Sequence, residues 1–289
     1  MLVGEIGTTV ETTSVRVDGL RVRCLVAGKG AAPPVVLLHG GGFDCAGLSY
    51  RYAIEPLSRL RPVIAFDWPG YGGSDTPNLR CDLAYHARFL SRLMDSLRIR
   101  RAVLVGLSMG GGAALSFALR SRERVDKLVL AASYGLGKEI PYGRLGYCLV
   151  HAPFATDLVY ALLRRSRRAL RSGLRSIVWD PRVVSEELVE EARGLLDRPA
   201  SGRAFRSFRK SEVGWGGLRT DLSSRLGGVA APTLLIHGDH DRVVPLEWAR
   251  SAHKRLPNSE LRVLRDCGHW PLRERPDEFN RLVADFLAR

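Results

Sequence analysis

Short apolar runs alternate with longer segments of helical periodicity along most of this chain. The apolar runs fall at residues 33–38, 63–66, 102–105, 127–131 and 232–236, and an alternating run falls at 260–264. Helical patterns fall at residues 50–60, 83–97, 109–120, 246–256 and 277–288. Apolar strands that alternate with helices are typical of a parallel sheet covered on both faces. The order therefore predicts an α/β fold with a mostly parallel central sheet.

The N-terminal region and one internal segment depart from this alternation. Residues 14–17 and 20–26 alternate in polarity, and Asp18-Gly19 between them is the signal of a two-residue hairpin. Residues 134–218 show helical patterns without a convincing strand, although strand–helix units lie on both sides. We interpret this segment as a helical cap, or lid, inserted into one core. The core then comprises residues 1–133 and 219–289.

Arginine dominates the cationic residues, and the formal net charge is +14. A net positive charge of this size is typical of proteins that bind nucleic acid, a membrane surface or acidic substrates. The sequence contains no nucleic-acid-binding module and no basic run interleaved with aromatic residues, which argues against nucleic acid. We therefore interpret the charge as a solvated, arginine-rich surface.

A row of arginines recurs at helical spacing within the expected cap, in a helix predicted over residues 159–177. The row consists of Arg164, Arg168, Arg171 and Arg175. Such a helix could rest on an anionic membrane or guide anionic substrates toward a cleft. Its other face is less polar, with Leu163, Ser166, Leu170 and Leu174. We prefer a helix that docks through this face and exposes its arginines to solvent.

The chain lacks the sequence signals of a membrane or secreted protein. No stretch approaches the ~18 apolar residues needed to cross a bilayer, and residues 1–10 lack a signal-peptide pattern. The five cysteines show no metal-ligand or disulfide spacing, which suits a reducing compartment. We expect a cytoplasmic protein without metal, cofactor or membrane insertion that acts on a small molecule. The sequence does not decide between a monomer and a homo-oligomer.

The GLSMG sequence at residues 106–110 follows an apolar run and precedes a helical pattern. A G-x-S-x-G sequence between a strand and a helix is the nucleophile elbow of serine hydrolases. Its turn is so tight that only small residues fit beside the serine, and Gly106 and Gly110 meet that need. The alternative is a glycine-rich turn with a helix-capping serine. We predict Ser108 as a nucleophile at the carboxyl edge of the sheet, where open α/β folds bind ligands.

A serine hydroxyl needs a base before it can attack near neutral pH. His269 lies in the DCGHWP sequence at 266–271, in a loop between the last strand and the last helix. Asp241 lies in the HGDHDRVVP sequence at 237–245, directly after an expected strand. A carboxylate there can hold the imidazole in the tautomer that accepts the serine proton. We predict Ser108, Asp241 and His269 as a catalytic triad, in the chain order that the elbow motif favours.

The loop that carries Asp241 offers two alternatives. Asp239 lies two residues away and is the rival for the acid. His237, Asp239, His240 and Asp241 also resemble a cluster of metal ligands. Dense His and Asp loops usually reflect turn chemistry, so we expect no metal here.

An oxyanion hole needs N–H donors aimed at the charge that develops during acyl transfer. The first expected donor is the backbone N–H of Met109, directly after the nucleophile. The HGGG sequence at 39–42 suits the second donor, which we assign to Gly41, with Gly42 as the alternative. A plain glycine turn is the other interpretation, and His39 is expected to brace its own loop. The expected pocket beneath the cap is lined partly by Gly40, Gly42, Phe43, Met109, Val244 and Trp270.

From residue 33 to its end the sequence resembles α/β-hydrolases. The matching motifs are HGG at 39–41, DWPGYGGSD at 67–75, the GLSMG elbow, GDHDRVVP at 238–245 and GHWP at 268–271. Together they are highly specific for the superfamily but not for a substrate. The resemblance implies the α/β-hydrolase fold, with a mostly parallel sheet and an inserted helical cap.

A closer resemblance is to the meta-cleavage-product hydrolases, which split a carbon–carbon bond in dienoates from aromatic breakdown. The shared sequences are HGGG at 39–42, SMGG at 108–111, SEEL at 185–188, GHW at 268–270 and the stretch 277–287. That family carries Asn after the oxyanion glycines and before the nucleophile, where this chain has Ser49-Tyr50 and Leu107. The family's cap Arg, which holds the substrate carboxylate, would fall near Ala192-Arg193.

These departures favour the hydrolysis of small carboxylic esters, or related acyl bonds, through an acyl-enzyme. Carbon–carbon cleavage of dienoates by the same triad is the alternative. A non-catalytic ligand receptor on this fold is a third hypothesis, but a receptor need not keep a triad or an oxyanion loop. Ser108 also argues against dehalogenases and most epoxide hydrolases, which use Asp as the nucleophile.

Overall fold

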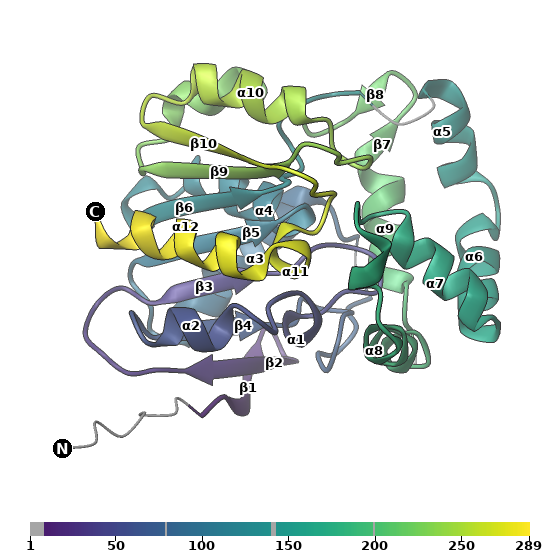
Figure 1. Cartoon of the computed structure of the whole chain (residues 1–289), viewed down its shortest axis with the longest axis horizontal. Coiled ribbons are helices and arrows are strands. Elements are labelled where there is room, and N and C mark those ends of the chain that lie inside the picture. Colours follow the sequence, from purple (N-terminus) through teal and green to yellow (C-terminus); the bar gives the residue numbers. More distant parts are fainter. Residues whose placement is uncertain (1–8, 79, 140–142, 199) are drawn as a thin grey trace.

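The central sheet has eight strands in the order β1-β2-β4-β3-β5-β6-β9-β10 (Figure 1). The fold is that of a computed structural model, which describes residues 9–78, 80–139, 143–198 and 200–289. The strands are β1 (Glu11–Val17), β2 (Leu20–Ala27), β3 (Val35–Leu38), β4 (Val63–Phe66), β5 (Ala102–Leu107), β6 (Val125–Ala131), β9 (Thr233–Gly238) and β10 (Ser259–Leu264). Strands β3 to β10 of this sheet pair in parallel, whereas β1 and β2 pair antiparallel with their neighbours. The predicted mostly parallel sheet is confirmed.

Asp18 and Gly19 form the turn between β1 and β2. Both residues have positive φ angles, 52° and 80°. Two residues in this conformation make a turn whose twist matches that of the flanking strands. The register pairs Val17 with Leu20, so the hairpin has the two-residue loop that the sequence predicts.

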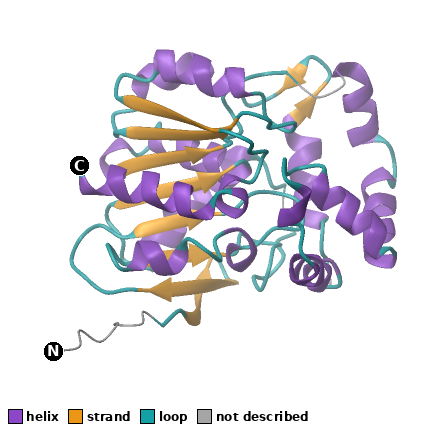
Figure 2. Ribbon diagram, in the orientation of Figure 1, coloured by secondary structure: helices purple, strands orange, loops and turns teal. Residues whose placement is uncertain are grey.

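Successive side chains of the central strands enter separate apolar cores on the two faces of the sheet. In β3, Val36 and Leu38 face the first core, and Val35 and Leu37 face the second. The first core includes α3 (Leu83–Ser96), α4 (Met109–Ala118) and α10 (Leu246–Arg255). The second includes α1 (Ala46–Ser49), α2 (Ile54–Ser58), α11 (Pro271–Glu274) and α12 (Pro276–Ala288). Helices therefore cover both faces of the sheet, as Figure 2 shows.

The helix expected over residues 50–60 is interrupted, so this expectation was wrong in detail. Helix α1 ends before Tyr50, and α2 begins only at Ile54. Tyr50 is fully buried, and its hydroxyl donates to the carbonyl oxygens of Leu38 and Val105, each at 2.9 Å. These hydrogen bonds fix the backbone at Tyr50 against the sheet, and the next helix, α2, begins only after this point.

Between β6 and β9 the chain forms a layer of helices beyond one edge of the sheet (Figure 1). We call residues 143–218 the inserted segment. Its helices are α5 (Gly143–His151), α6 (Ala155–Arg165), α7 (Arg167–Arg175), α8 (Glu186–Leu196) and α9 (Arg203–Glu212). A small hairpin of β7 (Val213–Gly214) and β8 (Gly217–Leu218) follows, so the expectation of no strand was wrong here. The remaining elements are the 3₁₀ helices η1 (Arg122–Arg124), η2 (Pro181–Val183) and η3 (Ser223–Gly228).

The arginine-rich helix predicted over residues 159–177 is two helices, and the prediction of one was wrong. Ser166 has extended backbone angles, φ −125° and ψ 108°, and its side chain accepts a hydrogen bond from the amide of Ala169. Serine is favoured at the N-cap of a helix, because its side-chain oxygen accepts a hydrogen bond from an amide that has no partner within the helix. Leu170 and Leu174 of α7 are buried, in agreement with the expected docking face.

The turn from β5 to α4 depends on close contact between backbone segments, which generates a stability prediction. A methyl group on Gly110 would lie 2.1 Å from the carbonyl oxygen of Leu38 and 2.6 Å from that of His39. Neither backbone atom can move aside without shifting β3. We expect Gly110→Ala to lower the free energy of unfolding by about 2 kcal/mol or more.

The matched control is Gly194→Ala in α8, where an added methyl group meets nothing within 4 Å. This change should raise the free energy of unfolding by about 0.5–1 kcal/mol, because alanine favours a helix interior. Urea unfolding of both variants and the parent measures the difference. Equal midpoints for Gly110→Ala and the parent would contradict the predicted clash.

Candidate active site

Ser108 occupies the turn between β5 and α4, with φ 50° and ψ −116°. This conformation is strained for a residue with a side chain, and such strain concentrates at functional sites. A methyl group on Gly106 would lie 2.5 Å from the carbonyl oxygen of Gly110, so the two glycines permit the turn. The turn directs Ser108 into a cavity beneath the inserted segment.

His269 is paired with Asp241 and not with Asp239. The Nδ1 atom of His269 lies 2.8 Å from Oδ2 of Asp241. Asp239 instead accepts a hydrogen bond from the amide of Cys267 at 3.3 Å, and its side chain is partly exposed. Of the two carboxylates that the sequence offered, the structure brings Asp241 to the histidine.

Four donors surround the buried carboxylate of Asp241. Its Oδ1 accepts from the amides of Val243 and Val244, at 2.8 and 2.9 Å. Its Oδ2 accepts from His269, and Nε2 of His237 lies 3.2 Å away. Burial opposes ionisation, but the two imidazoles outweigh it and hold the pKa of Asp241 well below its ordinary value. The carboxylate therefore stays ionised and orients His269.

His237 has a positioning role that the sequence analysis missed. It is buried at the end of β9, and its Nε2 also lies 3.0 Å from the carbonyl oxygen of Val244. One ring N–H thus faces two oxygen acceptors across the turn that carries Asp241. The signal in the sequence is the i, i+4 spacing of His237 and Asp241, which suits a contact between the two side chains as well as metal binding. In the part of the chain that the structure describes, no three potential metal ligands cluster.

Glu274 holds the loop of His269 in place. Its carboxylate accepts from the amides of Gly268 and Trp270, and also from Trp179 in the inserted segment at 2.7 Å. The amide of His269 donates to the carbonyl oxygen of Ile177 at 2.8 Å. Contacts with the inserted segment therefore help to fix the histidine, which no local motif could have indicated.

Ser108 and His269 line the same cavity, so the hydroxyl and the imidazole border one space. Within the described ranges, no hydrogen bond joins Ser108 Oγ to His269. Catalytic hydrogen bonds are often long without substrate and tighten when it binds. The arrangement is therefore compatible with a base that takes the Ser108 proton during attack.

The amides predicted for the oxyanion hole are free to bind a ligand. The amide of Gly40 is engaged by Oδ2 of Asp44 at 2.8 Å. Among the described residues, the amides of Gly41, Gly42 and Met109 donate no hydrogen bond. Gly41 and Met109 also line the cavity beside Ser108, where they can face a developing oxyanion.

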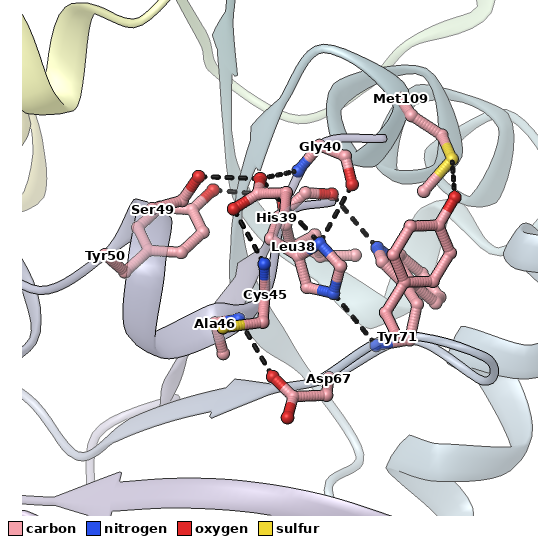
Figure 3. A network of polar contacts seen from close by, with 12 residues as sticks. Leu38, His39, Gly40, Cys45, Ala46, Ser49, Tyr50, Asp67, Tyr71 and Met109 are labelled. Atoms are coloured by element: carbon pink, nitrogen blue, oxygen red, sulfur yellow. Dashed lines mark hydrogen bonds and ion pairs between the residues drawn. The ribbon is translucent and has the colours of Figure 1, made fainter. Parts of the chain in front are cut away.

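A buried network around Asp44 braces the predicted oxyanion loop after β3, and Figure 3 labels three of its members, Gly40, Cys45 and Ser49. Besides the amide of Gly40, Asp44 accepts from the amide of Cys45 at 2.7 Å and the hydroxyl of Ser49 at 2.6 Å. Ser49 Oγ in turn accepts from the indole N–H of Trp270 at 2.9 Å. Burial raises the pKa of Asp44 above its ordinary value. This chain of contacts links the oxyanion loop to the loop that carries His269.

His39 braces the same loop, as the sequence predicts. Its Nε2 accepts from the amide of Trp68 at 3.0 Å, so Nδ1 carries the proton and donates to the carbonyl oxygen of Gly40 at 2.8 Å (Figure 3). The indole N–H of Trp68 donates to the carbonyl oxygen of His39 at 3.1 Å. Tyr71 donates to the sulfur of Met109 at 3.7 Å. These contacts tie the loops after β3 and β4 to the start of α4.

The cavity has a volume of about 560 Å³ and a mostly apolar lining. It brings together all the residues predicted for the pocket, Gly40, Gly42, Phe43, Met109, Val244 and Trp270. The inserted segment contributes further lining that the sequence analysis did not assign, including Leu149, Val150, Phe205, Phe208, Arg209 and Glu212. These residues lie on helices whose inward faces cannot be read from periodicity alone.

Arg209 differs from the other charged lining residues. Glu212 is satisfied by the amide of Leu83 and the hydroxyl of Tyr134, at 2.7 and 3.1 Å, and Glu139 accepts from Trp248 at 2.7 Å. Arg209 pairs with no acidic side chain in the described ranges. Its guanidinium lies over the ring of Phe205, 5.8 Å from the centroid. The cavity therefore holds one unpaired cation on a wall formed by α9.

The positions that the family resemblance marks for substrate contacts are occupied differently here. Leu107 lines the cavity and presents an apolar side chain. Ala192 is fully buried in α8. Arg193 faces Asp197 at 3.8 Å and does not belong to the lining.

Comparison with known proteins extends over both the core and the inserted segment. A family model described as alpha/beta hydrolase fold matches residues 33–276. A 2-hydroxy-6-oxononadienedioate/2-hydroxy-6-oxononatrienedioate hydrolase of Cupriavidus pinatubonensis is 34% identical over 276 residues, which are 93% of this chain and 91% of the relative. A 2-hydroxy-6-oxo-6-phenylhexa-2,4-dienoate hydrolase of Burkholderia cepacia is 34% identical over 289 residues, with 97% of each chain covered.

A solved structure with similar architecture is a meta-cleavage product hydrolase of Pseudomonas fluorescens. It superposes with a TM-score of 0.80 at 29% identity, covering 96% of this chain and 97% of that chain. The likeness therefore includes the arrangement of the elements as well as their order.

The geometry of the site predicts the effects of three substitutions. Ser108→Ala should remove nearly all turnover, about 10⁴-fold or more, while leaving the fold intact. Asp241→Asn should cost about 10⁴-fold, because an amide favours the wrong imidazole tautomer. Asp239→Asn is the matched control and should keep activity within about tenfold, since Asp239 does not contact His269.

Steady-state rates on one substrate, with melting curves for each variant, measure these effects. If Ser108→Ala kept activity within tenfold of the parent, Ser108 would not be the nucleophile. A larger loss in Asp239→Asn than in Asp241→Asn would reverse the assignment of the acid.

Proposed function

This chain belongs to the α/β-hydrolase fold family and is a hydrolase, and on that premise we propose that it cleaves a carbon–carbon bond in 2-hydroxy-6-oxo-dienoate-type substrates. In this proposal Ser108, His269 and Asp241 form the catalytic triad. The names of the similar proteins support this substrate class. The observation in the chain itself that carries the proposal is the unpaired Arg209 in the cavity wall.

The first half of the proposed reaction is attack on the substrate's ketone. His269 removes the proton from Ser108 Oγ, which bonds to the carbonyl carbon at position 6. Asp241 stabilises the imidazolium that results, and its depressed pKa keeps it ionised for this task. The amides of Gly41 and Met109 donate hydrogen bonds to the former carbonyl oxygen, which now carries the negative charge.

The second half breaks the bond between that carbon and its neighbour in the dienoate chain. The substrate first tautomerises to its keto form, in which the proton of the 2-hydroxyl group has moved to carbon 5. The electron pair of the broken bond then passes into this conjugated fragment as a dienolate. The imidazolium of His269 returns its proton to this fragment, which leaves. Water activated by His269 then hydrolyses the acyl-Ser108 ester and releases a carboxylic acid.

Arg209 supports an anionic substrate. Burial lowers the pKa of Arg209 below its ordinary value, which reflects the cost of keeping this cation away from water. A substrate carboxylate would offset that cost with a charge-assisted hydrogen bond. Phe205 contacts both Arg209 and the loop of Gly41: the guanidinium lies over its ring, and a methyl group on Gly41 would be 2.5 Å from that ring. Arg209 and Gly41 both line the cavity that contains Ser108.

We further propose that the segment predicted as a cap, residues 134–218, acts as a lid over Ser108. Phe205, Phe208 and Ile177 of this segment line the cavity together with the core loops. Closure of such a lid excludes water and strengthens the electrostatic interactions within the site.

Hydrolysis of small carboxylic esters is the second candidate, and the departures from the family resemblance favour it. Leu107 stands where the resemblance expects Asn, and neither Ala192 nor Arg193, near which it expects Arg, lines the cavity. An apolar pocket with an intact triad suits neutral acyl groups.

A substrate panel separates the two candidates. We expect kcat/KM for 2-hydroxy-6-oxo-6-phenylhexa-2,4-dienoate, followed by loss of its absorbance, to exceed that for p-nitrophenyl butyrate by about tenfold or more. Ser108→Ala is the blank for both assays. The reverse ratio would favour ester hydrolysis and contradict the carbon–carbon proposal.

Arg209→Met tests the anionic subsite. Loss of a charge-assisted hydrogen bond costs about 1.5–3 kcal/mol, so kcat/KM for the dienoate should fall about 10- to 100-fold. The neutral ester should be hydrolysed at nearly the parental rate. Arg206→Met is the matched control, since Arg206 lies on the same helix, pairs with Asp157 and lies outside the cavity. Equal losses on both substrates would mean that Arg209 only supports the fold.

A further inference from the structure

The corner formed by α5 and α6 exposes an unusual amount of apolar surface. Six large apolar side chains between residues 145 and 162 are each more than half exposed. They are Leu145, Leu149, Phe154, Leu158, Val159 and Leu162, which we call the apolar corner. In Figure 1 these helices form the outermost part of the inserted segment, on the side away from the sheet. Large apolar side chains gathered at the surface in this way mark interaction surfaces.

Helix α6 is apolar on its outer face as well as on its inner face. Its inner face contributes Tyr160, which is buried. Leu158 and Leu162 are four residues apart and therefore share the outer face, which is exposed. A helix that only docked on its core would carry polar residues on that outer side. The outer face thus lacks the composition expected of a surface in contact with water.

Phe154 is the most exposed of these residues, at 79%, and has a left-handed backbone with φ 60°. It stands at the break between α5 and α6, where the chain bends by 78°. In the described part of the chain no single helix is long and apolar enough to cross a membrane. The bend favours a corner that inserts side chains into a surface over a pair that spans a bilayer.

Positive charge surrounds the apolar corner. Residues 143–175 contain seven arginines and one acidic residue, Asp157, which pairs with Arg206. Two of these arginines, Arg167 and Arg171, pair with Glu186 of α8. Arg144 lies over the exposed ring of Trp215, 5.3 Å from its centroid. Arg165 and Arg168, at and beyond the end of α6, have no acidic partner among the residues described. Arginine and tryptophan beside an apolar face are the side chains that suit the headgroup region of a bilayer.

The apolar corner is continuous with the cavity of the candidate active site. Leu149 is more than half exposed and also lines the cavity, together with Gly146 and Val150 of the same helix. A surface that covered α5 would therefore touch the outer wall of the cavity that contains Ser108.

We infer that the apolar corner of α5 and α6 docks this protein on the surface of an anionic lipid bilayer. The apolar side chains would enter the acyl boundary, and the surrounding arginines would meet the anionic headgroups. A second copy of the chain suits the corner less well, because symmetric contact would bring the same arginines of both copies together.

Vesicle sedimentation of the full chain tests this inference independently of the reaction, and Ser108→Ala protein serves equally well. The probes are phosphatidylcholine vesicles and vesicles of phosphatidylcholine with about one-third phosphatidylglycerol. We expect binding to the anionic vesicles, at least tenfold weaker binding to the neutral ones, and a decrease with added salt.

Phe154→Glu/Leu158→Glu should lower binding to the anionic vesicles at least tenfold. The matched control is Val10→Glu/Leu60→Glu, which adds the same charge at exposed apolar residues outside the corner and should bind like the parent. Circular dichroism melting verifies that each variant folds. Arg144→Gln/Arg165→Gln should reduce the preference for anionic vesicles without removing an apolar contact.

Two results would overturn the inference. One is the absence of sedimentation with either vesicle. The other is a dimer in light scattering that Phe154→Glu/Leu158→Glu converts to a monomer while vesicle binding is absent or unchanged. That outcome would assign the corner to contact between copies.

Discussion

The strained turn at Ser108 is the constraint on which the rest of the site depends. It requires β5 and α4 to approach so closely that a methyl group on Gly106 would be 2.5 Å from the backbone of Gly110. Gly110 in turn lies against the carbonyl oxygen of Leu38, at the end of β3. Because the oxyanion loop starts there, the same contact sets Gly41 and Met109 around one cavity. Backbone packing thus places Ser108 beside the amides predicted for the oxyanion hole, and the side chains of Asp44 and His39 brace their loop.

Two buried aspartates organise the loops around this turn and differ in charge behaviour. Asp241 faces two imidazoles, which hold its pKa well below the ordinary value despite burial. Asp44 binds two amides and the hydroxyl of Ser49, which do not outweigh burial, and its pKa is raised. The first suits a residue that must stabilise an imidazolium. The second is a structural acceptor, joined through Ser49 to Trp270 beside the catalytic loop.

The inserted segment supplies the lining residues that were not predicted from the sequence, including Arg209. Its helices are short, and their amphipathic faces are ambiguous, since α6 is apolar on both sides and α9 turns Arg209 toward the cavity. Sequence periodicity predicted that these residues are helical. It did not predict which faces pack, because that depends on how several helices meet one another and the core. The sequence also did not predict the break at Ser166. A serine can lie within a continuous helix or cap a new one, and only the packing of α6 and α7 decided between the two.

The sequence by itself determined the alternation of strands and helices, the hairpin at Asp18-Gly19 and the elbow around Ser108. These features are local, because periodicity and small residues act within a few positions of the chain. Only the tertiary structure decided that Asp241, not Asp239, reaches His269, and that Arg209 faces the cavity. Such outcomes join residues far apart in the sequence, and packing between separate elements selects them. The physical reason is that a side chain's direction follows from the element that carries it, but its partner follows from the assembled fold.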